Sequence, residues 1–145
     1  MKAVIQRVKH AKIEIDGEDV SHIERGILAL VGVEEKDSPE DAKKLASRLL
    51  HFRIFPDENG RMNLSLKDTN GDILLVPQFT LVAETNRGNR PSFSHSAKPN
   101  HAATLFDSLV KETSKEYSKV STGFFGADMN ISLVNDGPVT FFLGT

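Results

Sequence analysis

The sequence predicts a single α+β domain over residues 1–145, with a mostly antiparallel, barrel-like β-sheet and two main helices. Two observations predict this class. Short apolar segments with a period of two are separated by turn signals such as Asn70-Gly71, which is typical of antiparallel hairpins. Residues 38–52 and 99–117 instead show the helical period of apolar side chains. No repeat, linker or low-complexity tract divides the chain.

The first third of the chain is expected to supply three strands and a helix. Residues 11–15 alternate apolar and charged side chains, and a short strand follows near 20–23. Residues 26–34 are apolar on both faces, which predicts a buried central strand. Ser38 then suits a helix N-cap and Pro39 the first helical position, so the first helix is expected to begin there.

The longest expected strand covers residues 72–83. Alternation within it would place Gln78 and Thr80 side by side on an apolar face, where they would need hydrogen-bond partners. Their side chains could form hydrogen bonds with each other or with a neighbouring loop, or they could bind a ligand. Pro77 has no N–H for a ladder, so the strand is expected to turn an edge or a bulge there and to free nearby N–H groups. Further strands are expected at 52–55, 62–66, 128–134 and 139–143.

The last two expected strands flank a turn that is followed by a proline. Asn135, Asp136 and Gly137 are typical of a hairpin turn, but the next residue, Pro138, cannot donate to a ladder. A cis Gly-Pro bond would aim the carbonyls of Gly137 and Pro138 in the same direction and offer two rigid acceptors. The local sequence alone favours an ordinary trans proline at the start of a strand.

Composition and motifs exclude several classes of function. The chain has 18 basic and 20 acidic residues, so a nucleic acid would have to be held by a local patch. It has no cysteine, which excludes disulfides, thiolate metal sites and a cysteine nucleophile. The five histidines lack metal-ligand spacing, and no phosphate-binding or nucleophile motif is present, so no metal or cofactor is expected. The N-terminus resembles neither a signal peptide nor a membrane span, which favours a cytoplasmic protein with no membrane partner.

Two segments are candidates for contacts with nucleic acid. Arg87, Arg90 and Lys98 lie in a loop without acidic residues, where they could bind phosphate, although the loop could also be merely solvated. Phe124 and Phe125 lie between two glycines. They are expected in the core, but an aromatic side chain beside a glycine loop could also stack on a base.

Three motifs in combination carry a family resemblance. The segments PQFTL (77–81), RGNRPSFS (87–94) and GFFGADMNISLVNDGPVT (123–140) closely resemble those of the D-aminoacyl-tRNA deacylases, and the likeness runs nearly end to end. The resemblance implies the fold of that family and a homodimer with active sites at the subunit interface. It also implies a cofactor-free enzyme that hydrolyses the ester of D-aminoacyl-tRNA, and of glycine mischarged on tRNA(Ala).

The resemblance further implies roles for individual residues. Gln78, Phe79 and Thr80 would form the catalytic segment, in which the N–H groups near Phe79 and Thr80 stabilise the oxyanion and the 2′-OH of the substrate assists the reaction. A cis Gly137-Pro138 bond would project from the partner subunit and reject L-amino acids. The implied substrate-binding residues are Pro77, Phe125, Gly137 and Pro138, and the implied contacts with the tRNA acceptor stem are Arg87, Arg90 and Lys98.

One residue departs from the family pattern and leaves alternatives open. The bacterial family usually has serine where this chain has Pro77, and a related branch that acts on L-alanyl-tRNA also has proline there. That branch has alanine in place of Phe79, so Phe79 and the segment NDGPVT (135–140) favour the D-specific group. A catalytically idle RNA- or small-molecule-binding module on the same fold is the rival from another class.

Overall fold

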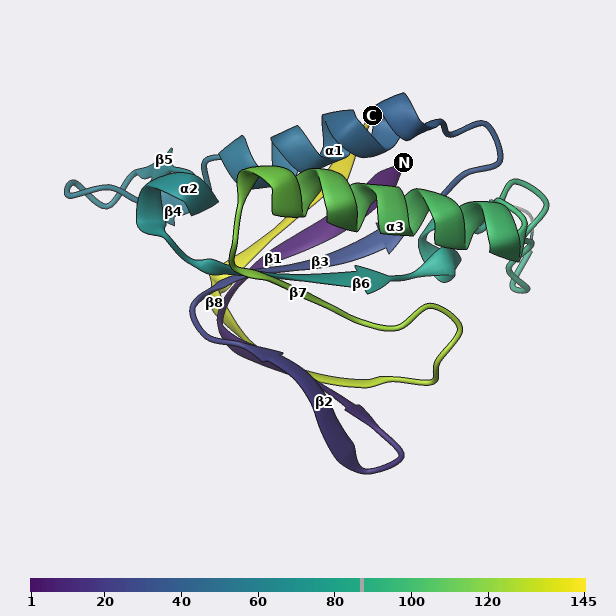
Figure 1. Cartoon of the computed structure of the whole chain (residues 1–145), viewed down its shortest axis with the longest axis horizontal. Coiled ribbons are helices and arrows are strands. Elements are labelled where there is room, and N and C mark those ends of the chain that lie inside the picture. Colours follow the sequence, from purple (N-terminus) through teal and green to yellow (C-terminus); the bar gives the residue numbers. More distant parts are fainter. Residues whose placement is uncertain (87) are drawn as a thin grey trace.

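The computed structural model of the chain describes residues 1–86 and 88–145 (Figure 1). One large sheet carries the two main helices on one face, and a smaller two-stranded sheet lies beside it. The elements in order are β1 (Lys2–Ile15), β2 (Glu18–Ile23), β3 (Gly26–Gly32), α1 (Pro39–His51), β4 (Phe55–Pro56), β5 (Met62–Leu64), α2 (Leu66–Thr69), β6 (Asp72–Pro77), the 3₁₀ helix η1 (Phe79–Val82), α3 (Pro99–Glu116), β7 (Val120–Thr122) and β8 (Asn130–Gly144).

The large sheet is organised around β1. This strand pairs with β3 and then β2 along one edge and with β8 along the other, and all three pairings are antiparallel. The β3–β6 and β6–β7 pairs are parallel, because each is connected through a crossover that contains α1 or α3. The α+β class, the barrel-like sheet and the two main helices are thus confirmed, with a sheet that is mixed rather than purely antiparallel.

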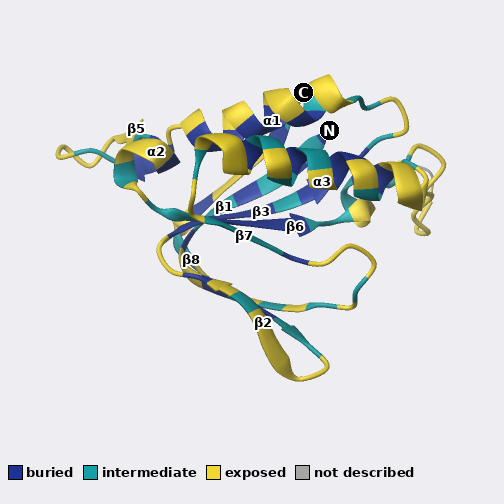
Figure 2. Cartoon of the chain, viewed as in Figure 1, coloured by how far each residue is buried: buried dark blue, intermediate teal, exposed yellow. Residues whose placement is uncertain are grey.

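Hydrophobic cores cover both faces of the central strands (Figure 2). Ile27, Ala29 and Val31 of β3 pack against the helices, whereas Leu28 belongs to a second cluster inside the curled half of the sheet. The segment that was expected to be a central strand is therefore buried on both sides, as its sequence predicts. This core fixes the ends of β3 and β6, where a cleft opens.

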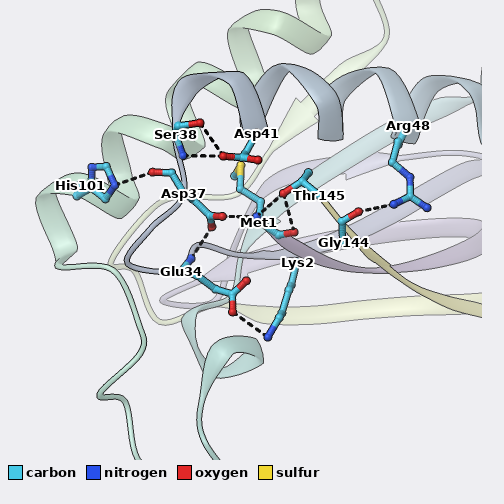
Figure 3. Close-up of polar contacts among 10 residues, drawn as sticks. All are labelled: Met1, Lys2, Glu34, Asp37, Ser38, Asp41, Arg48, His101, Gly144 and Thr145. Carbon is cyan, nitrogen blue, oxygen red and sulfur yellow. Dashed lines mark hydrogen bonds and ion pairs between the residues drawn. The ribbon is translucent and has the colours of Figure 1, made fainter.

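The two ends of the chain meet beside the start of α1 (Figure 3). The amino group of Met1 lies 2.5 Å from Asp37 Oδ1 and 2.7 Å from Thr145 Oγ1, and the Thr145 N–H donates to the Met1 carbonyl. The other carboxylate oxygen of Asp37 accepts the N–H of Glu34. These contacts tie β1, β8 and the turn that leads into α1 into one unit.

The expected strand at 72–83 is wrong beyond Pro77. β6 ends at Pro77, the Gln78 N–H makes a last bond to the Val31 carbonyl (2.7 Å), and the chain then turns into η1. Proline interrupts the ladder, as its missing N–H predicts, but the chain coils instead of resuming as a strand. Gln78 and Thr80 therefore do not alternate along a strand face.

The expected hairpin at 128–143 is also wrong. β8 is one continuous strand from Asn130 to Gly144, and both of its halves pair with β1 instead of with each other. Residues 136–139 of β8 lie opposite the single residue Arg7, because Asn135 pairs with Val8 and Thr140 with Gln6. The turn residues thus form a wide β-bulge within a strand, a feature that local turn chemistry does not distinguish from a hairpin.

The start of α1 gives a pH-dependent prediction. The Asp41 carboxylate accepts hydrogen bonds from the Ser38 hydroxyl (2.6 Å) and the Ser38 N–H (3.0 Å), and these two bonds, the hydroxyl first, lower the pKa of Asp41. A lowered pKa in the folded protein means that the ionised group stabilises the fold above the ordinary carboxyl pKa. That contribution is lost as the pH falls through the folded value.

We therefore expect Asp41→Asn to lower Tm by about 3 °C at neutral pH, and the difference from wild type to close in acid, over the range in which the protein stays folded. Thermal unfolding measured across pH checks this. Glu40→Gln removes a charge from the same helical turn and is the matched control. A difference for Asp41→Asn that is unchanged in acid would contradict the role of the carboxylate.

Candidate functional site

A cleft of about 760 Å³ opens where β3 and β6 end and α3 begins. Figure 1 shows that β6 points toward the side of the molecule on which α3 begins. The cleft is bounded by the ends of the two strands, by the segment from Phe93 to Pro99, and by the segment from Phe125 to Ile131. A volume of this size is typical of pockets that bind a small organic molecule.

The structure gathers part of the predicted site in this cleft. The predicted site residues that line it are Pro77, Gln78, Phe79, Lys98 and Phe125. Thr80 is exposed next to the lining, and Arg90 is exposed on the loop outside it. Arg87 lies outside the described residues.

The expectation that Phe124 and Phe125 are core residues is wrong. Their exposed fractions are 50% and 39%, and both lie in the segment that connects β7 to β8, outside the sheet. Phe125 faces the cleft, whereas Phe124 is not part of its lining.

The first turn of η1 presents main-chain donors beside the cleft. The N–H groups of Phe79 and Thr80 donate to none of the residues that the structure describes, whereas the next one, of Leu81, donates to the Gln78 carbonyl (3.3 Å). The first N–H groups of a 3₁₀ helix have no partner within the helix. Two adjacent free donors on a rigid turn are the arrangement that stabilises a developing oxyanion.

Gly32 sets the position of η1. A Cβ on Gly32 would lie 2.8 Å from Val82 Cγ1, 3.0 Å from Leu81 Cβ and 3.1 Å from the Gln78 carbonyl oxygen. Because two of these atoms belong to η1 and one to its N-cap, any side chain at this position would push the turn away from β3. Glycine here lets η1 lie directly on the strand.

The side chains of the motif offer little reactive chemistry. Gln78 Nε2 donates to Thr80 Oγ1 at 2.5 Å, so these two side chains satisfy each other, one of the outcomes expected from the sequence. An amide cannot take a proton from the hydroxyl, and a nucleophilic threonine needs a base. Thr80 is therefore better suited to positioning Gln78 than to attacking a substrate.

The bulge in β8 is closed by two side chains. The Asn135 amide accepts from the Val139 N–H (2.7 Å) and donates to the Val139 carbonyl (3.2 Å), which replaces a strand partner across the bulge. Arg7 donates to the carbonyls of Asp136 (2.9 Å) and Ile54 (2.6 Å) from beneath. The tip between these anchors, Gly137-Pro138, is exposed, and its peptide bond is cis.

Cleft and bulge lie at opposite ends of the sheet in one chain. Arg7, which faces the bulge, pairs with Ile27 of β3, whereas Pro77 pairs with Val31. The offset is about 13 Å along the strands, and the three strand spacings from β8 to β6 add about 14 Å across them. A single chain therefore does not bring Gly137-Pro138 to the free N–H groups of η1.

Sequence reasoning missed three residues that position these features, namely Arg7, Gly32 and Asn135. The only local signal was glycine at the end of a fully apolar strand, which indicates a close approach of backbone. The roles of Arg7 and Asn135 depend on the pairing of β1 with β8, which the sequence did not predict.

The described part of the chain holds no cluster of three or more side chains able to bind a metal. Within the same residues, no helix is long and apolar enough to cross a membrane. Polar side chains of the cleft lining are the amide of Gln78, the hydroxyl of Ser96, the ammonium group of Lys98 and the carboxylate of Asp128, and the Thr80 hydroxyl lies next to them.

The comparisons with known proteins agree with this geometry. The D-Tyr-tRNA(Tyr) deacylase family model matches residues 4–144. The chain is 53% identical to the D-aminoacyl-tRNA deacylase of Pseudomonas fluorescens (strain SBW25) over 100% of both chains. It is also 53% identical to that of Thermosipho africanus (strain TCF52B), over 99% of this chain and 96% of the relative.

A solved structure described as c-Myc DNA Unwinding Element Binding Protein superposes with a TM-score of 0.96 at 35% identity, covering 100% of this chain and 99% of that one. Fold and sequence agree over the whole length, which confirms the resemblance drawn from the motifs. The chain belongs to the D-Tyr-tRNA(Tyr) deacylase family of hydrolases that act on the ester bond of aminoacyl-tRNA.

Proposed function

We propose that this chain forms a homodimeric, cytoplasmic enzyme that hydrolyses D-aminoacyl-tRNA, such as D-Tyr-tRNA, and glycine mischarged on tRNA(Ala). The activity would be a proofreading step in translation. The observation that carries the proposal is the pair of free N–H groups, of Phe79 and Thr80, at the rim of a nucleoside-sized cleft. The reaction yields the free amino acid and tRNA with an intact terminal adenosine.

The proposed mechanism uses the main chain and the substrate. Water attacks the ester carbonyl carbon while the substrate's neighbouring 2′-OH helps to position it. The N–H groups of Phe79 and Thr80 stabilise the oxyanion, and Gln78 holds the substrate. The bond between the acyl carbon and the ribose oxygen then breaks, and the ribose oxygen takes up a proton. An activated ester needs no side-chain nucleophile, which fits the chemistry of the site.

A second copy of the chain would complete the site. The separation of cleft and bulge within one chain supports this, because only a partner can then place Gly137 and Pro138 beside the substrate. β8 is an edge strand whose exposed side chains include Val134 and Phe142, an apolar edge that a dimer would cover. The carbonyls of Gly137 and Pro138 would clash with an L side chain, whereas D-amino acids and glycine would avoid them.

Basic residues near the cleft would hold the tRNA. Lys98 lines the cleft and precedes α3, and Arg90 is exposed on the adjoining loop, both in positions to meet phosphates of the acceptor stem. The same role is proposed for Arg87, because it lies in the same segment of the sequence as Arg90. No acidic residue separates these cations along the chain from Arg87 to Lys98.

Hydrolysis of four charged tRNAs tests the function. We expect release of D-Tyr from tRNA at least about 100-fold faster than release of L-Tyr, with measurable release of glycine from tRNA(Ala) and no effect of a chelator. Binding of D-Tyr-tRNA without turnover would instead identify a binding module. Preference for L-Ala-tRNA would assign the chain to the branch that Pro77 resembles.

Thr80 tests whether the chemistry depends on the main chain. We expect Thr80→Val to lower kcat by less than about tenfold, because the N–H of residue 80 is retained. Steady-state hydrolysis of D-Tyr-tRNA measures this. Complete loss with an unchanged fold, together with a trapped acyl-enzyme, would establish Thr80 as a nucleophile.

Two glycine variants separate the cleft from the bulge. Gly32→Ala should displace η1, and Gly137→Ala should distort the bulge, because Gly137 has φ of 153° and its added Cβ would lie 2.6 Å from Val139 Cγ2. We expect each variant homodimer to lose at least about tenfold in kcat on D-Tyr-tRNA. Gly144→Ala, whose added Cβ has no atom within 4 Å, is the matched control and should keep full activity.

Mixing the two variants then shows whether each site is shared. A dimer of one Gly32→Ala chain and one Gly137→Ala chain keeps one site in which cleft and bulge are both intact. An equal mixture should therefore recover about a quarter of wild-type turnover. Subunit exchange is verified by mass spectrometry of tagged chains. If no turnover returned after full exchange, the cleft and the bulge would either act within one chain or not act together at all.

A further inference from the structure

Phe93 is an exposed aromatic side chain fixed at the rim of the cleft. Its ring centroid lies 5.2 Å from that of Phe79, with an angle of 49° between the rings. The exposed fractions are 42% for Phe93 and 60% for Phe79, and both side chains line the cleft. Two adjacent phenylalanines therefore present a continuous aromatic surface to solvent at the opening.

The main chain around Phe93 is held firmly on both sides. Ser92 exchanges two hydrogen bonds with Glu84, of 2.8 and 3.0 Å, and the Ser96 N–H donates to the Phe93 carbonyl (3.0 Å). The Ala97 N–H then donates to the carbonyl of Val33, the residue that follows β3 (3.2 Å). Phe93 is thus presented by a fixed backbone although it contributes nothing to either hydrophobic core.

Basic side chains lie near this aromatic surface, in a cleft whose lining also includes one carboxylate, that of Asp128. Arg90 lies three residues before Phe93, and Lys98 lines the same cleft, so phosphates and a base could be held together. A cleft of about 760 Å³ accommodates a terminal nucleoside and its amino acid. The nucleotide that precedes the terminal nucleoside of the tRNA must then lie across the rim of the cleft.

We propose that Phe93 stacks on the base of the nucleotide that precedes the terminal adenosine. This inference rests on the proposed function and adds a contact outside the reacting centre. Stacking on an aromatic side chain is tolerant of base identity, which suits a chain end common to all tRNAs. Phe93 would therefore strengthen binding of tRNA without touching the ester.

The test compares two substrates, D-Tyr-tRNA and D-tyrosyl-adenosine, which lacks the preceding nucleotide. We expect Phe93→Ala to raise KM for D-Tyr-tRNA by about 5- to 150-fold with kcat little changed, and to leave kcat/KM for D-tyrosyl-adenosine within about twofold of wild type. Phe93→Trp should rescue KM. Phe93→Leu, which keeps apolar bulk without a ring, should behave as Phe93→Ala does.

Phe124→Ala is the matched control, because Phe124 is 50% exposed but does not line the cleft. Equal loss on both substrates for Phe93→Ala would overturn the inference and make Phe93 a support for Phe79. No change on either substrate, rescue by leucine, or a shift from dimer to monomer would overturn it as well. Failure of the proposed function is a separate result, since wild-type protein would then hydrolyse neither substrate.

Discussion

The close packing of η1 against Gly32 is the contact on which the shape of the cleft depends. β6 cannot continue past Pro77 as a paired strand, and the absence of a side chain at Gly32 lets the chain coil directly onto the end of β3. The result is a turn whose first two N–H groups have no partner among the described residues. One glycine, Gly32, and one proline, Pro77, thus leave two main-chain N–H groups without a partner among the described residues, at the edge of a mostly apolar cleft.

The second constraint comes from β1. Because this strand is paired along both edges, it fixes β8 opposite β3 and thereby fixes the bulge at the end of the sheet remote from the cleft. Arg7 donates to the Asp136 carbonyl, and the Asn135 side chain accepts from the Val139 N–H. These contacts hold both ends of the bulge, while its tip is exposed. The proposed function requires a second copy of the chain, because one chain keeps the two main-chain motifs apart.

Much of the fold could be predicted from local patterns. The buried strand around Ala29 and the start of α1 at Pro39 follow from apolar periodicity and capping, which are properties of adjacent residues. The bulge could not be predicted, because Asn135-Asp136-Gly137 looks the same whether the flanking arms pair with each other or with a third strand. The motif resemblance pointed to Pro77, Gln78 and Phe79, which line the cleft. Gly32 and Arg7 could not be found in this way, because their contacts depend on the topology of the fold.

The central claim is that main-chain groups from two chains, and no reactive side chain, act on the ester. A crystal structure with a non-hydrolysable 3′-amide analogue of D-tyrosyl-adenosine tests it most directly. The account predicts that the analogue's carbonyl oxygen lies within hydrogen-bond distance of the N–H groups of Phe79 and Thr80. It also predicts that the Cα of the analogue faces Gly137 of the partner subunit. A carbonyl oxygen bound only by solvent or by the Thr80 hydroxyl, with the bulge of the second chain remote from the ligand, would contradict it.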